Sequence, residues 1–317
     1  MSCYKPLNAY FSKVKNQNGK RDITFKPNEA YLDMPVQIAC GRCIGCRLEV
    51  SRQWAVRAIH ESQSHERNSF LTLTYSEENL PENGSLKKEH VQKFIKRLRK
   101  KFPKKNIRYL YCGEYGENLK RPHYHLCLFG VDFHQDRKLY KRNFDDHKLY
   151  NSEILNKLWP YGHAVIGDLT YQSAAYVARY VTKKVKGSLQ AEKYGEKCDL
   201  QTGEVSLLLQ PEFAEASRRP ALGRDWFFEN YRQVYPNDFV VVNKRPQKPP
   251  KYYDFLLEQH DPDLYTKVKY KRKKSMEESI DKCPEEFDPY RLATKEEIRS
   301  RKGKRLTRSF ENETICN

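Results

Sequence analysis

Arg121-Pro122-His123-Tyr124-His125-Leu126-Cys127-Leu128-Phe129 is the stretch of sequence that decides the fold. Its short apolar run, bounded by turn-forming residues, predicts a β-strand over residues 121–129. Successive side chains of a strand point to opposite faces, so His123 and His125 project from the same face. Leu126 and Leu128 then point the other way, toward a core. The stretch therefore predicts a sheet with two imidazoles on one face and apolar packing on the other.

Two imidazoles on one face are the beginning of a site for a divalent metal ion, and a third ligand is expected on the neighbouring strand. Residues 107–114 predict that strand, and residues 115–120 predict a hairpin turn. Glu114 ends the strand, where hairpin pairing would bring its carboxylate beside the histidines; Glu117 is the alternative if the register differs. A His/His/carboxylate set suits Mg²⁺ or Mn²⁺ and leaves positions open for substrate oxygens.

A helix predicted over residues 171–185 carries a second group of reactive side chains. Tyr176 and Tyr180 lie one turn apart on one face, and Lys183 follows close to them. A phenol beside a metal-polarised phosphodiester can attack phosphorus, because the metal lowers the charge barrier while the phenol supplies the oxygen. The alternative is that the two tyrosines pack against the sheet.

The remaining periodicities predict the fold class. We expect strands at 70–75, 107–114, 121–129 and 163–170, and helices at 86–101, 151–159 and 171–185. Strand, helix, hairpin, helix, strand, helix indicates the α+β class, a central antiparallel sheet with flanking helices placed on one side. Residues 239–242 predict one more strand, and the prolines of residues 244–251 predict an extended linker.

The charge indicates the class of partner. The chain has 59 Lys and Arg against 41 Asp and Glu, a formal net charge of +18. Residues 85–142 hold 17 basic and five acidic residues, so two thirds of the excess lies in less than a fifth of the chain. This concentration favours a polyanionic partner. An aromatic content of 13% excludes a wholly disordered protein.

The sequence also predicts where the protein acts. No run of about 18 apolar residues is present, and the first residues lack the apolar stretch of a signal peptide. We therefore expect a protein that enters no membrane and stays in the cytoplasm.

Cys40, Cys43 and Cys46 form a C-x₂-C-x₂-C motif that supplies three thiolates for tetrahedral Zn²⁺. Cys3 is the candidate for the fourth ligand, with His60 or His65 as alternatives. The opposing interpretation is a set of ordinary thiols in a glycine-containing turn.

Three motifs stand in order: the strand at 70–75, the His-Tyr-His strand and the two-tyrosine helix. In this order they resemble the HUH rolling-circle replication initiators. Cys40-Gly41-Arg42-Cys43-Ile44-Gly45-Cys46, Ser217-Arg218-Arg219-Pro220 and Trp226-Phe227-Phe228 resemble the initiators of gokushovirus-type microviruses, which are small single-stranded DNA phages. The resemblance runs from about Cys3 to Leu257.

The resemblance implies a HUH endonuclease fold in which His123, His125 and Glu114 bind the metal and Tyr176 and Tyr180 act in turn. One tyrosine would nick the viral strand at the origin and keep its 5′ phosphate while the 3′ hydroxyl primes synthesis. The other would cut the regenerated junction. The phosphotyrosine bond keeps the energy of the phosphodiester, so rejoining needs no ATP, and the chain has no Walker-type loop. A host helicase and polymerase are then expected as partners in the host cytoplasm.

In this pattern Tyr180 is followed by Lys183, whereas Tyr176 has Arg179 in place of the lysine. The implied organisation is an N-terminal segment with the cysteine site at 1–66, the nicking core at 67–190, a family-specific extension at 191–245 and a charged, partly flexible C-terminal region at 246–317.

Basic residues would form a funnel around the histidines that tracks the backbone of single-stranded DNA. Tyr109, Tyr111 and Tyr115 are candidates for base stacking, with packing as the alternative. The expected DNA contacts are Arg97, Lys100, Lys101, Arg108, Lys120, Arg121 and Arg179.

Two further functions share these features. A transposase or relaxase of a mobile element uses the same histidines and tyrosines on another target. A non-catalytic basic nucleic-acid-binding protein would use the tyrosines only for stacking on bases.

Overall fold

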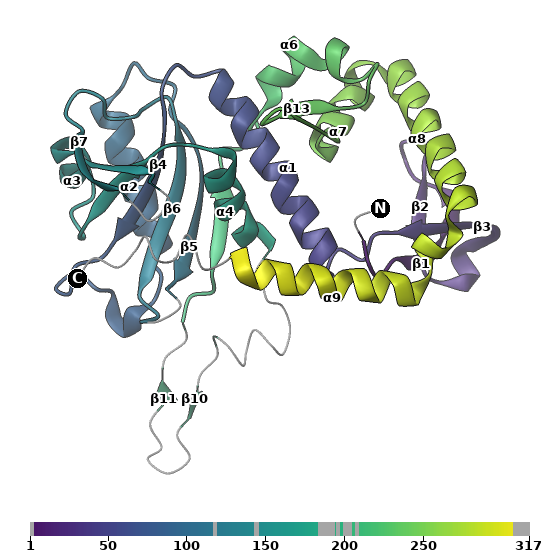
Figure 1. Cartoon of the computed structure of the whole chain (residues 1–317), viewed down its shortest axis with the longest axis horizontal. Helices are drawn as coiled ribbons and strands as arrows, with labels where there is room; N and C mark the ends of the chain where they lie inside the picture. Colours follow the sequence, from purple (N-terminus) through teal and green to yellow (C-terminus); the bar gives the residue numbers. More distant parts are fainter. Residues whose placement is uncertain are drawn as a thin grey trace. The chain divides into compact units, whose positions relative to one another are not determined.

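The structure, a computed structural model, describes residues 3–116, 119–142, 146–182, 194, 197–198, 205–206 and 209–306 (Figure 1). The chain divides into two compact units. One contains the chain up to Glu49 together with the segment from Lys271, and the other contains residues 50–270. The domain limits predicted from the sequence, at residues 66, 190 and 245, stay a prediction.

The larger unit is built on a seven-stranded sheet in which every neighbouring pair is antiparallel. Its order is β12-β5-β6-β4-β9-β8-β7. The strands are β4 (Asn68–Thr74), β5 (Arg108–Tyr115), β6 (Pro122–Phe129), β7 (Lys138–Arg142), β8 (Lys148–Asn151), β9 (Ala164–Gly167) and β12 (Phe213–Ala216). All eight residues of β6 are buried, as expected for a strand that is covered on both faces.

One face of the sheet packs against helices α2 (Lys88–Lys101) and α3 (Glu153–Leu158). Val91, Phe94, Ile95 and Leu98 recur at the spacing of a single helical stripe, which buries that stripe of α2 in the core. The sheet residues of this core include Leu71, Leu73, Tyr124, Leu126 and Leu128. The inward direction predicted for Leu126 and Leu128 is therefore confirmed.

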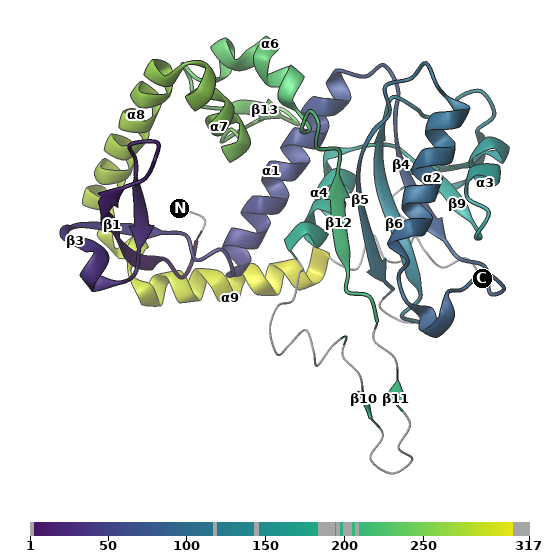
Figure 2. The same ribbon diagram turned by 180° about the vertical axis from the view of Figure 1, so that it is seen from behind.

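The opposite face packs against helices α1 (Ile44–Gln63) and α4 (Tyr171–Thr182) (Figures 1 and 2). Phe70, Leu110, Cys127 and Phe129 supply the sheet side of this second core. The α+β class with a central antiparallel sheet is confirmed, but the placement of all helices on one side was wrong. Both faces of β5 and β6 are apolar, so each face requires a cover.

The larger unit continues into a third core formed by α1, α6 (Arg224–Val234), α7 (Lys251–His260) and a hairpin of β13 (Val240–Val242) and β14 (Arg245–Gln247). The linker predicted at 244–251 was wrong, because residues 245–247 pair with β13 and α7 begins at Lys251. Pro246 is accommodated because a strand of a two-stranded hairpin has a free edge. Lys197–Cys198 (β10) and Val205–Ser206 (β11) form a separate small pair.

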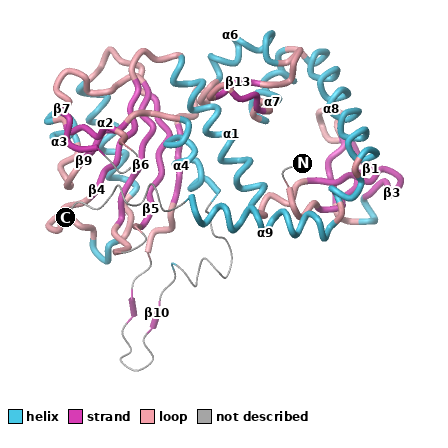
Figure 3. Tube along the Cα trace, viewed as in Figure 1, coloured by secondary structure: helices cyan, strands magenta, loops and turns pink. Residues whose placement is uncertain are grey.

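The smaller unit contains a three-stranded antiparallel sheet in the order β2-β1-β3. Its strands are β1 (Leu7–Lys15), β2 (Arg21–Thr24) and β3 (Ala30–Ile38), and its helices include α9 (Pro289–Leu306) and part of α8 (Pro262–Lys282) (Figure 3). Short 3₁₀ turns lie at Pro27–Glu29, Glu82–Gly84 and Pro284–Phe287.

The buried apolar residues of the smaller unit, among those that are described, are Cys3, Ala9, Ala30, Cys43 and Cys46. This unit therefore has a small hydrophobic core, and its largest cluster consists of cysteines. In the described part of the chain, none of the helices is long and apolar enough to span a membrane.

Candidate functional site

The pairing of β5 with β6 places the predicted metal ligands together. Glu114 lies directly opposite His123, and Cys112 lies opposite His125, so the three predicted side chains share one face. The Nε2 atoms of His123 and His125 lie 2.8 and 2.9 Å from the same carboxylate oxygen, Oε1 of Glu114. All three residues are buried. The hairpin register therefore brings together the His/His/Glu group that the sequence predicted.

The two tyrosines of α4 reach the same carboxylate. The Tyr176 hydroxyl donates a hydrogen bond of 2.6 Å to Oε1 of Glu114, and the Tyr180 hydroxyl oxygen lies 3.4 Å from that of Tyr176. Both rings are buried in the core between α4 and the sheet, so they also pack as the alternative interpretation held. The Ser51 hydroxyl on α1 donates to the Ala175 carbonyl, which fixes α4 against its neighbour.

Hydrogen bonds behind the histidines determine which ring nitrogen faces Glu114. The Arg121 carbonyl lies 3.2 Å from Nδ1 of His123 and can only accept, so Nδ1 carries the hydrogen. Nε2 of His123 is then the nitrogen free to bind a metal. Thr72 Oγ1 lies 3.1 Å from Nδ1 of His125 and occupies the equivalent position. Thr72 is a supporting residue that sequence reasoning missed, although β4 itself was predicted.

The electrostatics of the cluster favour an ionised carboxylate. Burial alone would raise the pKa of the Glu114 carboxyl, but the hydrogen bonds and charges of the two imidazoles hold it well below its usual range. Burial lowers the pKa of His125 and outweighs its bond to Glu114. Burial also opposes the charge on His123, yet its closer bond to Glu114 raises the pKa of that imidazole. One carboxylate therefore attracts two rings, as expected where a cation would satisfy all three groups.

The donor set fits a divalent cation on a separate observation. Oε2 of Glu114 is buried and has no hydrogen-bond partner among the described residues. An unsatisfied carboxylate oxygen inside a protein costs about 1–3 kcal/mol or more, and a bound ion removes that cost. The ligand atoms of Glu114, His123 and His125 all lie within 4.8 Å of one another.

Two predicted residues lie outside the described part of the chain, namely Lys183 and Glu117. Arg179, the residue at the position of the missing first lysine, lies with its guanidinium carbon 5.6 Å from the ring centre of Tyr176. A cation therefore lies next to Tyr176.

The basic residues of α2 do not surround the histidines. Helix α2 packs against the face that carries Tyr124 and Leu126, whereas His123 and His125 project from the other face. The expected funnel was therefore wrong for this helix, because sequence proximity does not specify which side of the sheet a crossover helix covers. Lys100 and Lys101 are exposed at the end of α2.

The other predicted DNA contacts have varied surroundings. Arg97 donates to the Leu158 carbonyl at 2.8 Å. Arg108 is 6% exposed and is bound by Glu61 and the Pro220 carbonyl, so it stabilises the fold. Lys120 is exposed, and Arg121 pairs with Glu77, both in the β5–β6 turn next to His123. Their contact with DNA stays a prediction.

The four cysteines of the N-terminal segment form a second cluster, and their sulfur atoms lie within 4.8 Å of one another. Cys40 and Cys46 sulfurs are 3.9 Å apart, as are those of Cys3 and Cys43. A tetrahedral Zn²⁺ with bonds of about 2.3 Å separates its sulfurs by about 3.8 Å. The structure therefore brings Cys3 to the motif, at the spacing of a tetrahedral site.

Backbone amides donate to these sulfurs. The N–H groups of Cys43 and Cys46 donate to Sγ of Cys40 and Cys43 at 3.3 and 3.4 Å, and the N–H of Cys40 donates to Cys3 at 3.3 Å. Burial opposes ionisation of Cys40, but the backbone donors lower the pKa of its thiol to about 7. The thiolate is the form that binds metals.

The alternative fourth ligands are engaged elsewhere. The His60 ring stacks on Trp226 with centroids 3.5 Å apart, and its Nδ1 lies 2.9 Å from the Tyr253 hydroxyl. Burial lowers the pKa of His60 to about 3. His65 pairs with Glu61 at 3.2 Å. Both histidines therefore contribute to packing of the larger unit.

Comparison with known proteins supports a replication role. Residues 68–185 match the family model of replication-associated protein ORF2. The chain is 34% identical to replication-associated protein ORF2 of Spiroplasma virus 4 and 32% identical to replication-associated protein VP4 of Bdellovibrio phage phiMH2K. These matches cover 86% of both chains and 87% of this chain with 85% of the relative, respectively.

A third relative, replication-associated protein ORF4 of Chlamydia phage 1, is 33% identical over 69% of this chain and 53% of its own length. No solved structure matches the chain. The matches to whole phage proteins, together with the buried His/His/Glu cluster and its two tyrosines, lead to one conclusion: the chain belongs to the replication-associated proteins of gokushovirus-type phages.

Proposed function

We propose that this chain initiates rolling-circle replication by nicking the viral DNA strand at the origin through tyrosine attack. The observation that carries the proposal is the hydrogen bond of 2.6 Å from the Tyr176 hydroxyl to Glu114, whose same oxygen faces both histidines. A buried phenol, a carboxylate and two imidazoles meeting at one atom form the donor set of a metal-assisted nucleophilic site.

His123, His125 and Glu114 would hold Mg²⁺ or Mn²⁺, which suits a mixed nitrogen and oxygen set. When bound, the ion supplies positive charge that stabilises the phosphoryl oxygens in the transition state. Arg121 and Thr72 keep the two imidazoles oriented through their Nδ1 atoms.

In the chemical step, the tyrosine oxygen forms a bond to phosphorus and the bond from phosphorus to the 3′ oxygen breaks. The proton released by the phenol is balanced by the proton that the departing 3′ oxygen takes up. The products are a 5′-phosphotyrosine and a free 3′ hydroxyl that a polymerase can extend. One phosphodiester is exchanged for another, so the reverse reaction rejoins the strand without ATP.

Tyr176 and Tyr180 would act in turn, since their hydroxyl oxygens are 3.4 Å apart and can reach one phosphate position alternately. Arg179, over the ring of Tyr176, would take the role that Lys183 has for Tyr180. Unwinding and synthesis would fall to a host helicase and polymerase in the host cytoplasm.

The proposal is tested by incubating the full-length chain with single-stranded origin DNA of its own replicon and Mn²⁺ or Mg²⁺. The expected result is a denaturant-stable protein–DNA adduct together with a product that ends in a 3′ hydroxyl. A mobile-element transposase would form such an adduct on the ends of its element and not on this origin. Binding without any adduct on either DNA would support a non-catalytic nucleic-acid-binding protein.

For the cysteine cluster we infer a structural Zn²⁺ site formed by Cys3, Cys40, Cys43 and Cys46. All four sulfurs lie at tetrahedral spacing, and the smaller unit buries few other apolar groups. Small units with little core are commonly stabilised by a metal. The site would join the start of the chain to the first turn of α1.

Purified protein is expected to contain about one zinc ion per chain, and Cys43→Ser should remove it and expose the N-terminal segment to proteases, because binding and folding of such sites are coupled. Elemental analysis and limited proteolysis provide the measurements. Cys283→Ser is the matched control, since Cys283 is exposed and lies outside the cluster. Full zinc content in Cys43→Ser, or none in the wild type, would contradict the site.

A further inference from the structure

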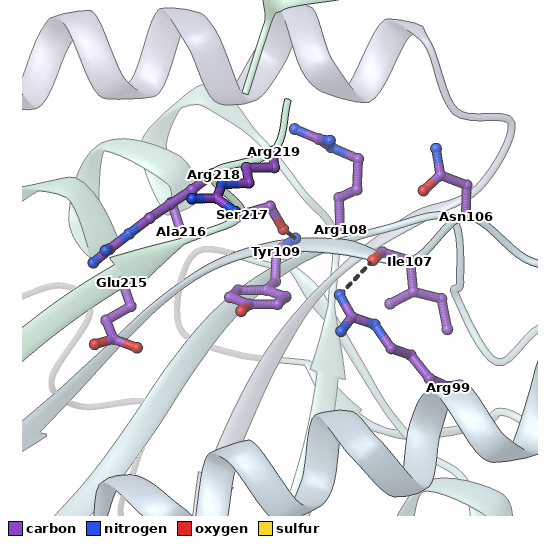
Figure 4. Close-up of a pocket in the computed structure, with 10 residues that line it drawn as sticks. All are labelled: Arg99, Asn106, Ile107, Arg108, Tyr109, Glu215, Ala216, Ser217, Arg218 and Arg219. Atoms are coloured by element: carbon purple, nitrogen blue, oxygen red, sulfur yellow. Dashed lines mark hydrogen bonds between the residues drawn. The ribbon is translucent and has the colours of Figure 1, made fainter. Parts of the chain in front are cut away.

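A cationic cavity lies at the end of β5 opposite Glu114 (Figure 4). It has a volume of about 610 Å³ and we call it the arginine pocket. Its lining residues are Arg99, Asn106, Ile107, Arg108, Tyr109, Glu215, Ala216, Ser217, Arg218 and Arg219. They come from the end of α2, the start of β5 and the segment that follows β12, three parts of the chain that the sheet brings together.

The charge of the arginine pocket is positive and largely uncompensated. Arg99, Arg218 and Arg219 are exposed, and within the described ranges no carboxylate lies at ion-pair distance from any of them. Glu215 does line the pocket, but Lys88 forms an ion pair with it and the Tyr111 hydroxyl donates to it at 2.9 Å. Exposed guanidinium groups without a carboxylate partner are suited to phosphate oxygens.

The segment carrying Arg218 and Arg219 is fixed by buried groups. Arg108 donates to the Pro220 carbonyl at 2.6 Å, and the N–H of Gly223 donates to Glu61 at 2.7 Å. Gly223 has a φ of 77°, and a Cβ there would lie 2.5 Å from the Tyr253 hydroxyl, so glycine is required. The backbone on either side of the two arginines is therefore held in place before any ligand binds, which reduces the ordering cost of binding.

An aromatic ring lies beside these cations. Tyr109 is partly buried, and the guanidinium carbon of Arg99 is 5.8 Å from its ring centre. The backbone of Tyr109 pairs with Ser217 through bonds of 2.9 and 3.1 Å. Arginine and tyrosine together form the combination that contacts both the phosphates and the bases or sugars of nucleic acid.

The arginine pocket is distinct from the nicking site. Arg108 and Glu114 stand near the two ends of β5, about 20 Å apart at about 3.3 Å per residue. That length corresponds to about six nucleotides of one strand in a B-form duplex, at about 3.4 Å each. A DNA molecule held at Glu114 could therefore reach the pocket only through nucleotides that flank the cleaved bond.

We propose that the arginine pocket binds backbone phosphates of DNA flanking the nick, with Arg218 and Arg219 as its principal contacts and Arg99 and Tyr109 in support. The pocket rests on the proposed function only in that its ligand is DNA. It assigns the Arg218-Arg219 pair a role in holding the origin during cleavage and rejoining, when the broken strand ends must stay together.

The test uses full-length protein with Tyr176→Phe and Tyr180→Phe, in EDTA, so that binding is measured without cleavage. Its probes are two single strands of origin DNA centred on the nick, one of about 8 and one of about 25 nucleotides; only the longer can reach the pocket at about 3.4 Å per nucleotide. Adding Arg218→Ala and Arg219→Ala is expected to weaken binding of the longer strand about tenfold, with less than about a twofold effect on the shorter one. The dependence of affinity on salt should fall by about 1.5, or about 0.7 for each lost phosphate contact.

Lys251→Ala with Lys267→Ala is the matched control, because it removes two exposed positive charges from helices α7 and α8. It should change the affinity for the longer strand less than about twofold. Equal losses on both strands, no loss on either, or an equal loss in the control would overturn the proposal. If the wild-type protein formed no adduct, the nicking function would fail while this binding result could still stand.

Discussion

Replacing both Tyr176 and Tyr180 by phenylalanine is expected to abolish the covalent DNA adduct and to reduce cleavage by about 1000-fold or more, because no attacking oxygen remains. The two hydroxyl oxygens are neighbours at 3.4 Å, so either single substitution should leave one usable nucleophile. We expect each single variant to form an adduct while the cycle of nicking and rejoining is impaired. Denaturing gels of a labelled origin strand, followed by mass spectrometry of the linked peptide, measure both effects.

Tyr111→Phe is the control for the tyrosine variants. It removes a buried hydroxyl that donates to Glu215 on the other face of the sheet. Its adduct formation should match that of the wild type. An adduct of undiminished yield in the double variant would show that neither tyrosine is the nucleophile.

Glu114→Gln is expected to lower metal-dependent cleavage by about 100-fold or more, since an amide replaces the carboxylate that faces both imidazoles. The side chain keeps its size, so the buried site should stay packed. The metal concentration needed for half-maximal cleavage should rise, because the charge attracting the ion is lost. Titration of Mn²⁺ against initial cleavage rate measures this shift, and EDTA should stop the wild-type reaction.

Glu215→Gln makes the same chemical change at β12, across the sheet, and should leave the metal requirement unchanged. Binding of uncleaved DNA should survive in Glu114→Gln, because the exposed cations are elsewhere. If Glu114→Gln cleaved with the metal dependence of the wild type, Glu114 would not be a ligand.

The sequence could predict what depends on short spacing. The alternation of His123 and Leu126 identified their opposite faces, and the hairpin between Glu114 and His123 set the register of the ligand group. The stripe that includes Val91 and Leu98 located α2 within two residues of its ends. In each case the relevant neighbours are close in the chain, so local geometry determines the result.

What depended on long-range packing could not be predicted in this way. The side of the sheet taken by α2 is decided by which face α1 and α4 occupy, and α1 begins more than 40 residues earlier. The strand β14 and the anchoring of Pro220 by Arg108 likewise join segments far apart in sequence. Composition in residues 244–251 suggested a linker because Pro246 is uncommon in strands, and its position at a free edge removes that conflict.

The strand β12 has a consequence for dividing the protein into fragments. Its residues Phe213 and Ala216 pair with Gly113 and Leu110, so β12 closes one side of the large sheet from a position beyond residue 185, where the family match ends. A fragment limited to residues 68–185 would expose the N–H and C=O groups of β5 as a bare edge. Such a fragment should self-associate through that edge, whereas one extended through α6 should stay monodisperse at the same concentration.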